Sequence, residues 1–159
     1  MNRIAVIDLG TGNLRSVARA LETAAGGGCR VRITESADDV AAADRVVFPG
    51  QSAIRSVMDR LRGNGALLDA LLRAIEDKPF LGICIGLQAL YRHSTEDGGV
   101  ECLGVLHGEV RHFLEADGGA AGSLTDPDTG ARLKIPHMGW NTVRLDRDHP
   151  LWRGIEPDS

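Results

Sequence analysis

The sequence is poor in cysteine, in aromatic residues and in long apolar runs. Aromatic residues make up 4% of the 159 positions, and the three cysteines are Cys29, Cys84 and Cys102. An odd number of widely spaced cysteines without a Cys-x-x-Cys pair argues against disulfides and structural zinc, and predicts a reduced, cytoplasmic protein. No apolar run approaches the length that crosses a bilayer, and Met1-Asn2-Arg3 leads directly into an apolar strand, so neither a membrane span nor a signal peptide is predicted.

An excess of positive charge is also lacking. The formal net charge is −4, and no long run of lysine or arginine occurs, which excludes a general nucleic-acid surface. A composition of 43% hydrophobic and 25% charged residues is that of an ordinary globular chain. The simplest organisation is therefore a single domain over residues 1–159.

Apolar runs alternate with amphipathic stretches through the first half of the chain. Short apolar runs are typical of strands buried in a parallel sheet, and each is followed by a helical pattern. The fold class that this alternation predicts is α/β, a doubly wound, mostly parallel sheet with ligands at the carboxyl ends of its strands. Shorter strands are expected around an intervening surface loop in the C-terminal half. The predicted strands are Ile4–Leu9, Val31–Ile33, Arg45–Phe48 and Phe80–Ile83, then Leu103–Phe113 and Leu133–Leu145, and the loop is Asp117–Gly130.

The stretch Lys78–Leu90 predicts a nucleophile elbow. Its centre reads Gly-x-Cys-x-Gly, with Cys84 where a strand turns sharply into a helix. The two glycines leave room for neighbouring segments at such a turn, which lifts the central residue to the carboxyl end of the sheet. A helix N-terminus also favours the thiolate over the thiol. We interpret Cys84 as a catalytic nucleophile rather than a buried structural cysteine.

The third predicted strand ends in Pro49-Gly50-Gln51-Ser52, which should lie beside the elbow. Elbow enzymes take one oxyanion-hole N–H from the residue after the nucleophile and another from a neighbouring strand-end loop. Those groups would be Ile85 and the Gly50–Ser52 segment, where Gly50 is free to adopt the backbone angles that aim an N–H at the site. Without the elbow, an ordinary Pro-Gly turn would explain this stretch.

A second glycine pattern, Gly10-Thr11-Gly12 after the first strand, resembles half of a dinucleotide-binding fingerprint. Glu35 would then be the ribose acid. The third glycine of the fingerprint is missing because Arg15 stands there. A tight strand-to-helix turn accounts for the pattern without a cofactor.

A thiolate nucleophile normally needs a general base, and none of the five histidines fits that role. His93 lies too far along the helix predicted to follow Cys84. His107 and Glu109 have the spacing of a base and an acid on one strand face, but in a turn-like setting. His137, in KIPHMGWN, has no carboxylate near it in sequence. The other two, which look solvated, are His112 and His149.

Four stretches together resemble the glutaminase subunits of imidazole glycerol phosphate synthase, which are class I glutamine amidotransferases of histidine biosynthesis. They are IDLGTGNLRSVARALE, FPGQSA, GICIGLQAL and KIPHMGWNTV, and the similarity runs from Ile4 to about Ile155. KIPHMGWN is the most specific, because amidotransferases of other pathways share the elbow but not this phrase. Those relatives also tend to have histidine at the position of Leu87 and a Pro-Gly-Pro-Gly loop at Pro49–Ser52.

The resemblance implies an activity and a set of site residues. Cys84 would attack the side-chain amide of L-glutamine, form a thioester and release ammonia, and water would then complete glutamate. Ile85 and Gly50 would supply the oxyanion-hole N–H groups. No cofactor and no metal are implied. The residues that would hold the substrate are Gln88, Gln51 and Ser52.

The resemblance also implies a partner, a (β/α)8-barrel cyclase that receives the ammonia and forms a heterodimer with the glutaminase. The segment around Gly10–Asn13 faces that partner in the family, so Asn13 and Gly12 are the predicted interface residues. The family glutaminase is nearly silent until the partner binds its own substrate. The loop at Pro49–Ser52 is then thought to reorient.

Two departures from the family pattern bear on activity. Ser52 stands where the family often has a second glycine, and it would restrict the reorientation of the loop. The family's His-Pro-Glu segment, which carries the catalytic histidine and glutamate, is not found before Ser159. We therefore expect a truncated subunit that is inactive by itself. The alternatives are a silent scaffold for an ammonium-dependent cyclase and another thiol hydrolase or class I amidotransferase.

Overall fold

The computed structural model describes residues 1–113, 125, 130, 135, 139 and 142–156. The chain forms two compact units, Met1–Ala116 and Asp117–Ser159. That all 159 residues make up one domain therefore stays a prediction. Most of the predicted loop at 117–130 lies outside the described residues. Of the strand predicted at 133–145, the described positions 135, 139 and 142–145 are not in a strand.

A four-stranded parallel sheet forms the centre of the first unit, in the order β2-β1-β3-β4. All three neighbouring pairs are parallel, which confirms the predicted fold class. The strand order places β1 and β3 in the middle, where their apolar runs are covered on both faces. The strands are β1 (Asn2–Ile7), β2 (Cys29–Thr34), β3 (Arg45–Phe48) and β4 (Phe80–Gly82).

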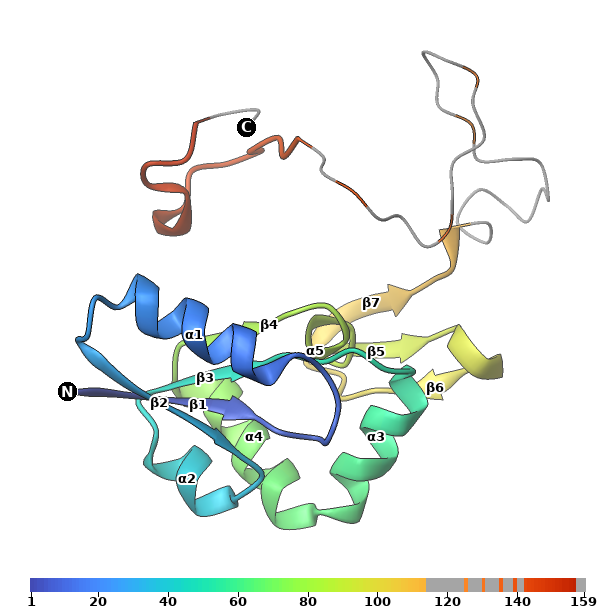
Figure 1. The fold of residues 1–159 in the computed structure, drawn as a ribbon. Coiled ribbons are helices and arrows are strands. Elements are labelled where there is room, and N and C mark those ends of the chain that lie inside the picture. Colours follow the sequence, from blue (N-terminus) through green and yellow to red (C-terminus); the bar gives the residue numbers. More distant parts are fainter. Residues whose placement is uncertain (114–124, 126–129, 131–134, 136–138, 140–141, 157–159) are drawn as a thin grey trace. The chain divides into compact units, whose positions relative to one another are not determined.

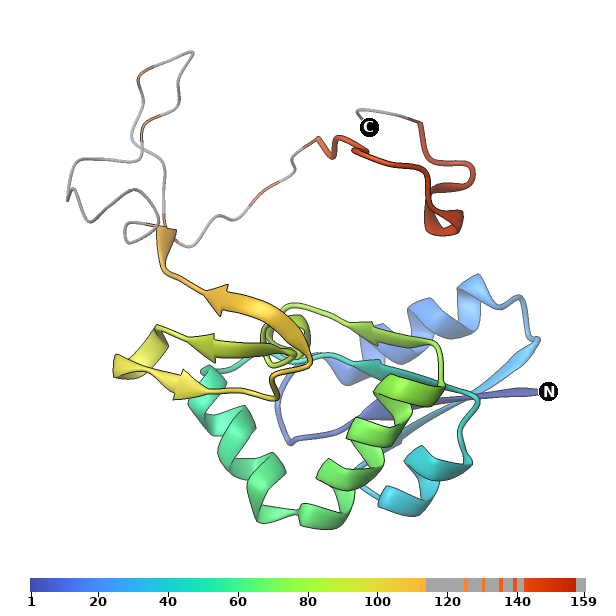
Figure 2. The same cartoon turned by 180° about the vertical axis from the view of Figure 1, so that it is seen from behind.

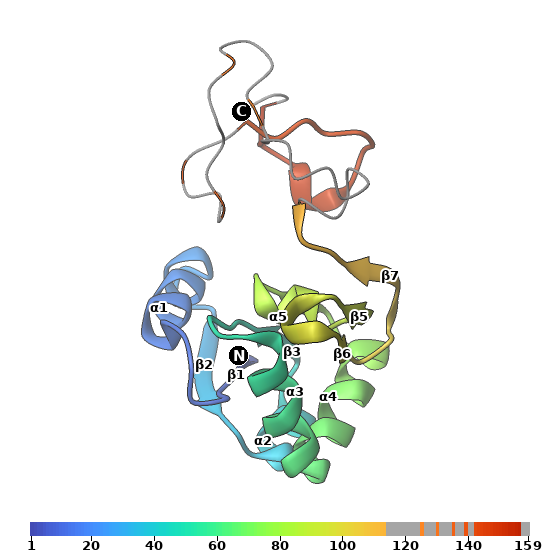
Figure 3. The same ribbon diagram turned by 90° about the vertical axis from the view of Figure 1, so that its right-hand side faces the viewer.

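Helices cover both faces of this sheet, as Figure 1 and Figure 3 show, with α1 on one side and α2, α3 and α4 on the other. The larger core cluster lies between the sheet and the three helices and includes Phe48, Leu61 and Leu71. A smaller cluster centred on Val6 and Val47 packs under α1. The helices are α1 (Leu14–Ala24), α2 (Ala37–Ala42), α3 (Ile54–Gly63), α4 (Gly65–Asp77) and α5 (Ile85–Gln88).

Short polar side chains cap the N-termini of α1, α2 and α4. The Asn13 side chain accepts from the backbone N–H of Ser16 at 3.3 Å, and Ser36 caps α2 in the same way. Asn64 ends α3, and its side chain accepts from the N–H of Leu67 at 3.1 Å at the start of α4. Asn64 therefore separates α3 from α4.

A second, three-stranded sheet follows the elbow, in the order β6-β5-β7 (Figure 2). β5 is antiparallel to β6 and parallel to β7, so the predicted additional antiparallel strands are present within a mixed sheet. The elements are β5 (Tyr91–Ser94), η1 (Glu96–Gly98), β6 (Val100–Glu101) and β7 (Leu106–Val110).

One local prediction in this region is wrong. His93 is not on the elbow helix, because α5 ends at Gln88 and His93 lies in β5. His107 and Glu109 lie in β7, inside the strand predicted at Leu103–Phe113, although their setting in the sequence is turn-like. At His93, long-range strand pairing overrides the local pattern, since β5 is extended between two partners.

In the second unit, the described residues include a short 3-10 turn, η2 (Pro150–Trp152). The imidazole of His149 precedes this turn, and its Nδ1 accepts from the backbone N–H of Leu151 at 3.2 Å. Over the part of the chain that the structure describes, no helix is both long and apolar enough to cross a bilayer.

Candidate active site

Cys84 lies between β4 and α5 in a strained backbone conformation. Its φ is 55° and its ψ is −116°. Among the non-glycine residues that the structure describes, only Cys84 and Asp97 have positive φ, a region that costs an L-residue free energy. The Cys84 side chain is exposed, and its carbonyl accepts from the N–H groups of Leu87 and Gln88, both at 3.0 Å. This is the geometry that the elbow motif predicts.

The two elbow glycines leave room for backbone, as predicted. A Cβ added to Gly86 would overlap the carbonyl oxygen of Phe48. A Cβ on Gly82 would come within 2.9 Å of the backbone nitrogen and Cα of Leu87. Because the obstructing atoms belong to the backbone, no side-chain rotation would relieve either contact.

The carbonyl of Phe48 is the part of the elbow that sequence reasoning missed. It accepts from the N–H of Ile83 at 3.0 Å, one residue beyond the last pair of the β3–β4 ladder, Phe48 with Gly82. This bond holds the residue before Cys84 against the end of β3. A backbone acceptor has no sequence signature, since every residue carries one.

The Gly50–Ser52 segment lies beside the elbow, which confirms the prediction from strand order. A Cβ on Gly50 would be 3.5 Å from the Cβ of Ile85. The backbone N–H groups of Gly50, Gln51 and Ile85 have no hydrogen-bond acceptor among the described residues. An oxyanion hole requires unpaired N–H groups on neighbouring segments, and these two segments supply such groups.

Gly50 does not use the conformational freedom of glycine in this structure. It is absent from the glycines with positive φ, and a Cβ at this position would meet only ordinary van der Waals contacts. The predicted backbone freedom of Gly50 is therefore not exercised in the conformation that the structure describes.

The loop after β1 is the third segment at this edge. Gly12 has a φ of 100°, and a Cβ on it would be 3.6 Å from the backbone nitrogen of Gln51. Gly10 also has positive φ, and its N–H donates to Asp8 Oδ1 at 2.7 Å. The Gly-x-Gly pattern thus forms a tight turn closed by its own aspartate. Gly12 and Asn13 are both exposed.

The predicted substrate-binding residues lie on two segments of the site, the loop after β3 and the helix α5. Gln88 is the last residue of α5 and is partly buried, whereas Gln51 is exposed. Ser52 is partly buried, and its Oγ is fully buried without a hydrogen-bond partner among the described residues. The structure therefore brings Gly12, Gly50–Ser52 and Cys84–Gln88 to one edge of the sheet.

The Sγ of Cys84 has no hydrogen-bond partner in the part of the chain that the structure describes. No general base for this thiol is therefore found among those residues. The carboxylate of Glu109 is engaged elsewhere, because Arg111 donates to Oε2 through Nε at 3.0 Å and Nη2 at 2.9 Å. These bonds and the charge of Arg111 hold the pKa of Glu109 below its usual value. His137 lies outside the described residues.

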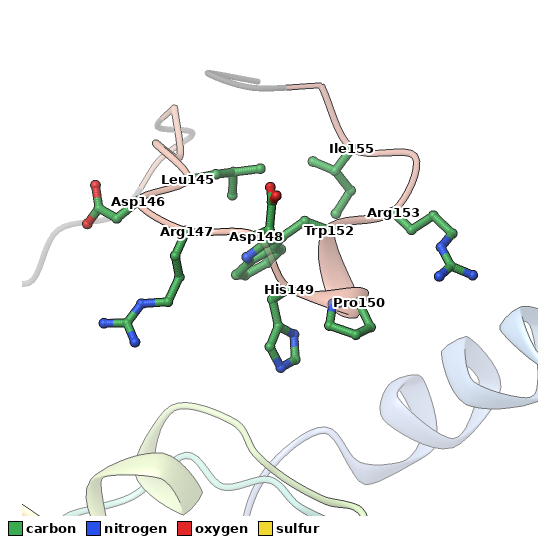
Figure 4. A pocket seen from close by; sticks show the side chains of 9 residues that line it. All are labelled: Leu145, Asp146, Arg147, Asp148, His149, Pro150, Trp152, Arg153 and Ile155. Atoms are coloured by element: carbon green, nitrogen blue, oxygen red, sulfur yellow. The ribbon is translucent and has the colours of Figure 1, made fainter.

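A cavity of about 730 Å³ in the second unit does not contain the predicted site (Figure 4). All of its lining residues come from one short segment, 145–155, and none is a cysteine, serine or threonine. The rings of His149 and Trp152 lie edge to face there, with centroids 6.4 Å apart. The described residues also contain no group of three or more acidic, histidine or cysteine side chains that could hold a metal ion.

The environments of two thiols predict a difference in reactivity. Burial raises the pKa of the Cys102 thiol above 9.0, an effect that Glu101 and Glu96 add to and Arg62 opposes. At pH 7 this thiol is protonated and a poor nucleophile, and its reactivity grows as the pH rises toward the pKa. Cys84 is exposed. We expect iodoacetamide to modify Cys84 before Cys102 at pH 7, as measured by peptide mass spectrometry. Modification of Cys102 before Cys84 at the same pH would contradict the assignment.

Comparison with known families assigns the protein class. A family model described as glutamine amidotransferase class-I matches residues 5–159. The chain therefore belongs to the class I glutamine amidotransferases, and its parallel sheet and cysteine elbow are consistent with that class.

Within this class, the chain is similar to the protein named imidazole glycerol phosphate synthase subunit HisH in several bacteria. It is 48% identical to that of Pseudomonas putida over 159 residues, which is 99% of this chain and 68% of the relative. It is 51% identical to that of Dechloromonas aromatica over 156 residues, or 98% of this chain and 67% of the relative. For Hydrogenovibrio crunogenus the identity is 45% over 156 residues, with 98% and 67% covered.

Proposed function

We propose that this protein is the glutaminase subunit of an imidazole glycerol phosphate synthase, and that it releases ammonia from L-glutamine. The observation that carries the proposal is the elbow, where strained Cys84 lies beside the unpaired N–H groups of Ile85 and Gly50. The family match and the similarity to HisH subunits support the same reaction.

The elbow would supply the nucleophile and the oxyanion donors of this reaction. The Sγ of Cys84 forms a bond to the side-chain carbonyl carbon of glutamine, and the N–H groups of Ile85 and Gly50 stabilise the oxyanion. The C–N bond then breaks, ammonia leaves with the proton from the thiol, and a thioester remains. Water adds to the thioester, which releases glutamate and restores the thiol. A base from outside the described residues would move the proton.

Gln88, Gln51 and Ser52 are proposed to hold the substrate. Gln88 lies one turn from Cys84 on α5, and the other two follow Gly50 on the neighbouring segment. The amide groups of Gln88 and Gln51 both donate and accept hydrogen bonds, as recognition of an amino acid requires. The Oγ of Ser52 is buried in the described conformation, so this hydroxyl would have to become accessible to take part. Cys84 therefore has polar groups near it on two segments.

The ammonia is proposed to pass to a (β/α)8-barrel cyclase, bound through the loop that contains Gly12 and Asn13. The relatives are named as subunits, which implies a partner. Gly12 and Asn13 are exposed, and Gly12 lies against Gln51 next to the candidate oxyanion hole. A partner on this loop would therefore be close to the site of ammonia release.

A second candidate is a catalytically silent scaffold for an ammonium-dependent cyclase. The absence of a base bonded to Cys84 Sγ within the described residues favours it. To separate the two, imidazole glycerol phosphate formation is measured with the barrel partner and its nucleotide substrate, with either glutamine or ammonium as the nitrogen source. Turnover with glutamine supports the glutaminase, whereas turnover with ammonium alone supports the scaffold.

Gly50→Ala is expected to lower glutamine hydrolysis while leaving the stability of the protein almost unchanged. In the described conformation an alanine fits, because φ is not positive and the nearest atom is 3.5 Å from its Cβ, so the stability of the protein should change by less than about 1 kcal/mol. If the Gly50 N–H must rotate toward the oxyanion, glutamine hydrolysis in the complex should fall by at least roughly tenfold. Thermal unfolding and a glutamate assay measure the two effects. Unchanged hydrolysis would show that no glycine-specific conformation is needed.

A further inference from the structure

A cavity lined by arginines lies on the parallel sheet, away from the elbow. Its volume is about 240 Å³, and β1, β2 and the C-terminal end of α2 form its walls. Arg3 contributes to the lining from β1, and Arg30 and Arg32 contribute from β2. The only carboxylate in the lining is that of Asp39. The cavity is therefore positively charged, although the whole chain has a formal net charge of −4.

The register of the two strands brings the three guanidinium groups together. β1 and β2 are parallel, with Arg3 opposite Arg30 and Ala5 opposite Arg32. Residues opposite each other, and residues two apart in one strand, share a face of the sheet. Ala5 belongs to the core cluster on the side of α2, α3 and α4. All three arginines therefore lie on that face, where the small side chain of Ala5 leaves space between them.

Two of the three arginines have a carboxylate partner, and the third has none. Arg32 Nη1 lies 2.8 Å from Asp39 Oδ1, and Arg3 Nη2 lies 3.6 Å from Asp44 Oδ1. Asp44 is held in place, because its Oδ2 accepts from the backbone N–H of Arg3 at 2.7 Å. In the part of the chain that the structure describes, the guanidinium group of Arg30 has neither a hydrogen-bond acceptor nor an ion-pair partner.

An anion between the strands would complete this charge balance. Like charges directly opposite each other in neighbouring strands disfavour the folded state, and Arg3 and Arg30 form such a pair. Guanidinium groups bind phosphate and carboxylate through paired N–H donors, and an arginine with one carboxylate partner keeps other donors free. Three arginines around one small space favour phosphate, whose oxygens point in several directions, over a planar carboxylate. The volume equals that of roughly eight water molecules, so it admits a phosphate group and little more.

We propose that Arg3, Arg30 and Arg32 form a binding site for a phosphate group, either free or carried by a small phosphomonoester. β2 is an edge strand, where charged side chains also deter pairing with other chains, but that role does not require an arginine in β1. The site is near the amino ends of β1 and β2, whereas Cys84 follows the carboxyl end of β4. A bound phosphate would thus leave the elbow free, and the inference does not depend on the proposed glutaminase activity.

Inorganic phosphate tests the site directly. Added at 20 mM to a phosphate-free buffer of low salt, it is expected to raise the thermal midpoint of the protein by at least about 3 °C more than sodium chloride of equal ionic strength. Its ³¹P resonance should shift saturably with protein concentration. Tighter binding of glycerol 3-phosphate in a parallel titration would assign a phosphomonoester, and weaker binding would assign free phosphate. Equal midpoints in phosphate and chloride, with no saturable ³¹P shift, would overturn the inference.

Arg30→Gln tests the assignment to the arginine cavity, because the substitution breaks no ion pair among the described residues. Without phosphate, its midpoint should equal or exceed that of the wild type, since the repulsion from Arg3 is removed. With phosphate, the wild type should have the higher midpoint, and the affinity of the variant should be about tenfold lower or less. Arg19→Gln is the matched control, since Arg19 is exposed on α1, and it should keep the wild-type affinity. Wild-type affinity in Arg30→Gln would overturn the inference.

Discussion

Replacing Cys84 by alanine will abolish glutamine hydrolysis, with a loss of at least about 10³-fold in the complex with the barrel partner. The thioester requires a nucleophile on the residue that the elbow presents, and neither Cys29 nor Cys102 lies on it. Ammonium-dependent formation of imidazole glycerol phosphate should survive, because the partner then receives its nitrogen from solution. Glutamine-dependent turnover that persists in Cys84→Ala would refute the role of Cys84.

Replacing Cys84 by glycine should abolish the same activity and also make the protein more stable. At φ 55° and ψ −116° an L-residue is strained, whereas glycine adopts positive φ without steric cost. The free energy of unfolding is therefore expected to rise by about 1–2 kcal/mol relative to Cys84→Ala, which keeps the strain. Chemical denaturation of the two variants measures the difference. Equal stabilities would show that the elbow stores no strain at Cys84.

Replacing Gly86 by alanine is expected to cause the largest loss of stability of any change proposed for this protein. The added Cβ would overlap the carbonyl oxygen of Phe48, the same oxygen that accepts from the N–H of Ile83 at 3.0 Å. To accommodate a methyl group, β3 and α5 would have to separate, which would break this bond. We expect the free energy of unfolding to fall by about 3 kcal/mol or more, which is roughly 6–12 °C in the thermal midpoint.

Gly63→Ala is the matched control for this effect. Gly63 is the last residue of α3, and a Cβ there would meet no atom within 4 Å. Because alanine is a better helix former than glycine, this variant should gain up to about 1 kcal/mol. Differential scanning calorimetry compares the two variants. If Gly86→Ala unfolds near the temperature of Gly63→Ala, the close approach of Phe48 and α5 is wrong.

The elbow shows how far local sequence reasoning reaches. The pattern Gly82-x-Cys84-x-Gly86 predicts a sharp turn that needs two small residues, and the structure confirms both. The prediction succeeds because strain at a tight turn depends mainly on residues close in the chain. The helix starts at Asn13 and Ser36 also depend on residues close in the chain, since a cap bonds to an N–H only three residues away.

Errors occur where distant segments decide the conformation. The sequence after Cys84 continues a helical pattern, but α5 stops at Gln88 and His93 joins a strand. β5 lies between β6 and β7, whose pairing gives it hydrogen bonds on both edges. No pattern within residues 84–94 indicates the pairing with β6 and β7. Local propensity therefore predicted a helix at His93, where the structure has a strand.

The sequence by itself determined the sharp turn at Cys84 and the parallel sheet that presents this residue, because these depend on short-range sterics and on apolar periodicity. Only the tertiary structure decided which groups meet Cys84 at the sheet edge. The order β2-β1-β3-β4 places the loops that contain Gly12 and Gly50 beside the elbow. The same packing buries the hydroxyl of Ser52 without a partner among the described residues. Such contacts join residues far apart in the chain, and strand order and packing determine them together.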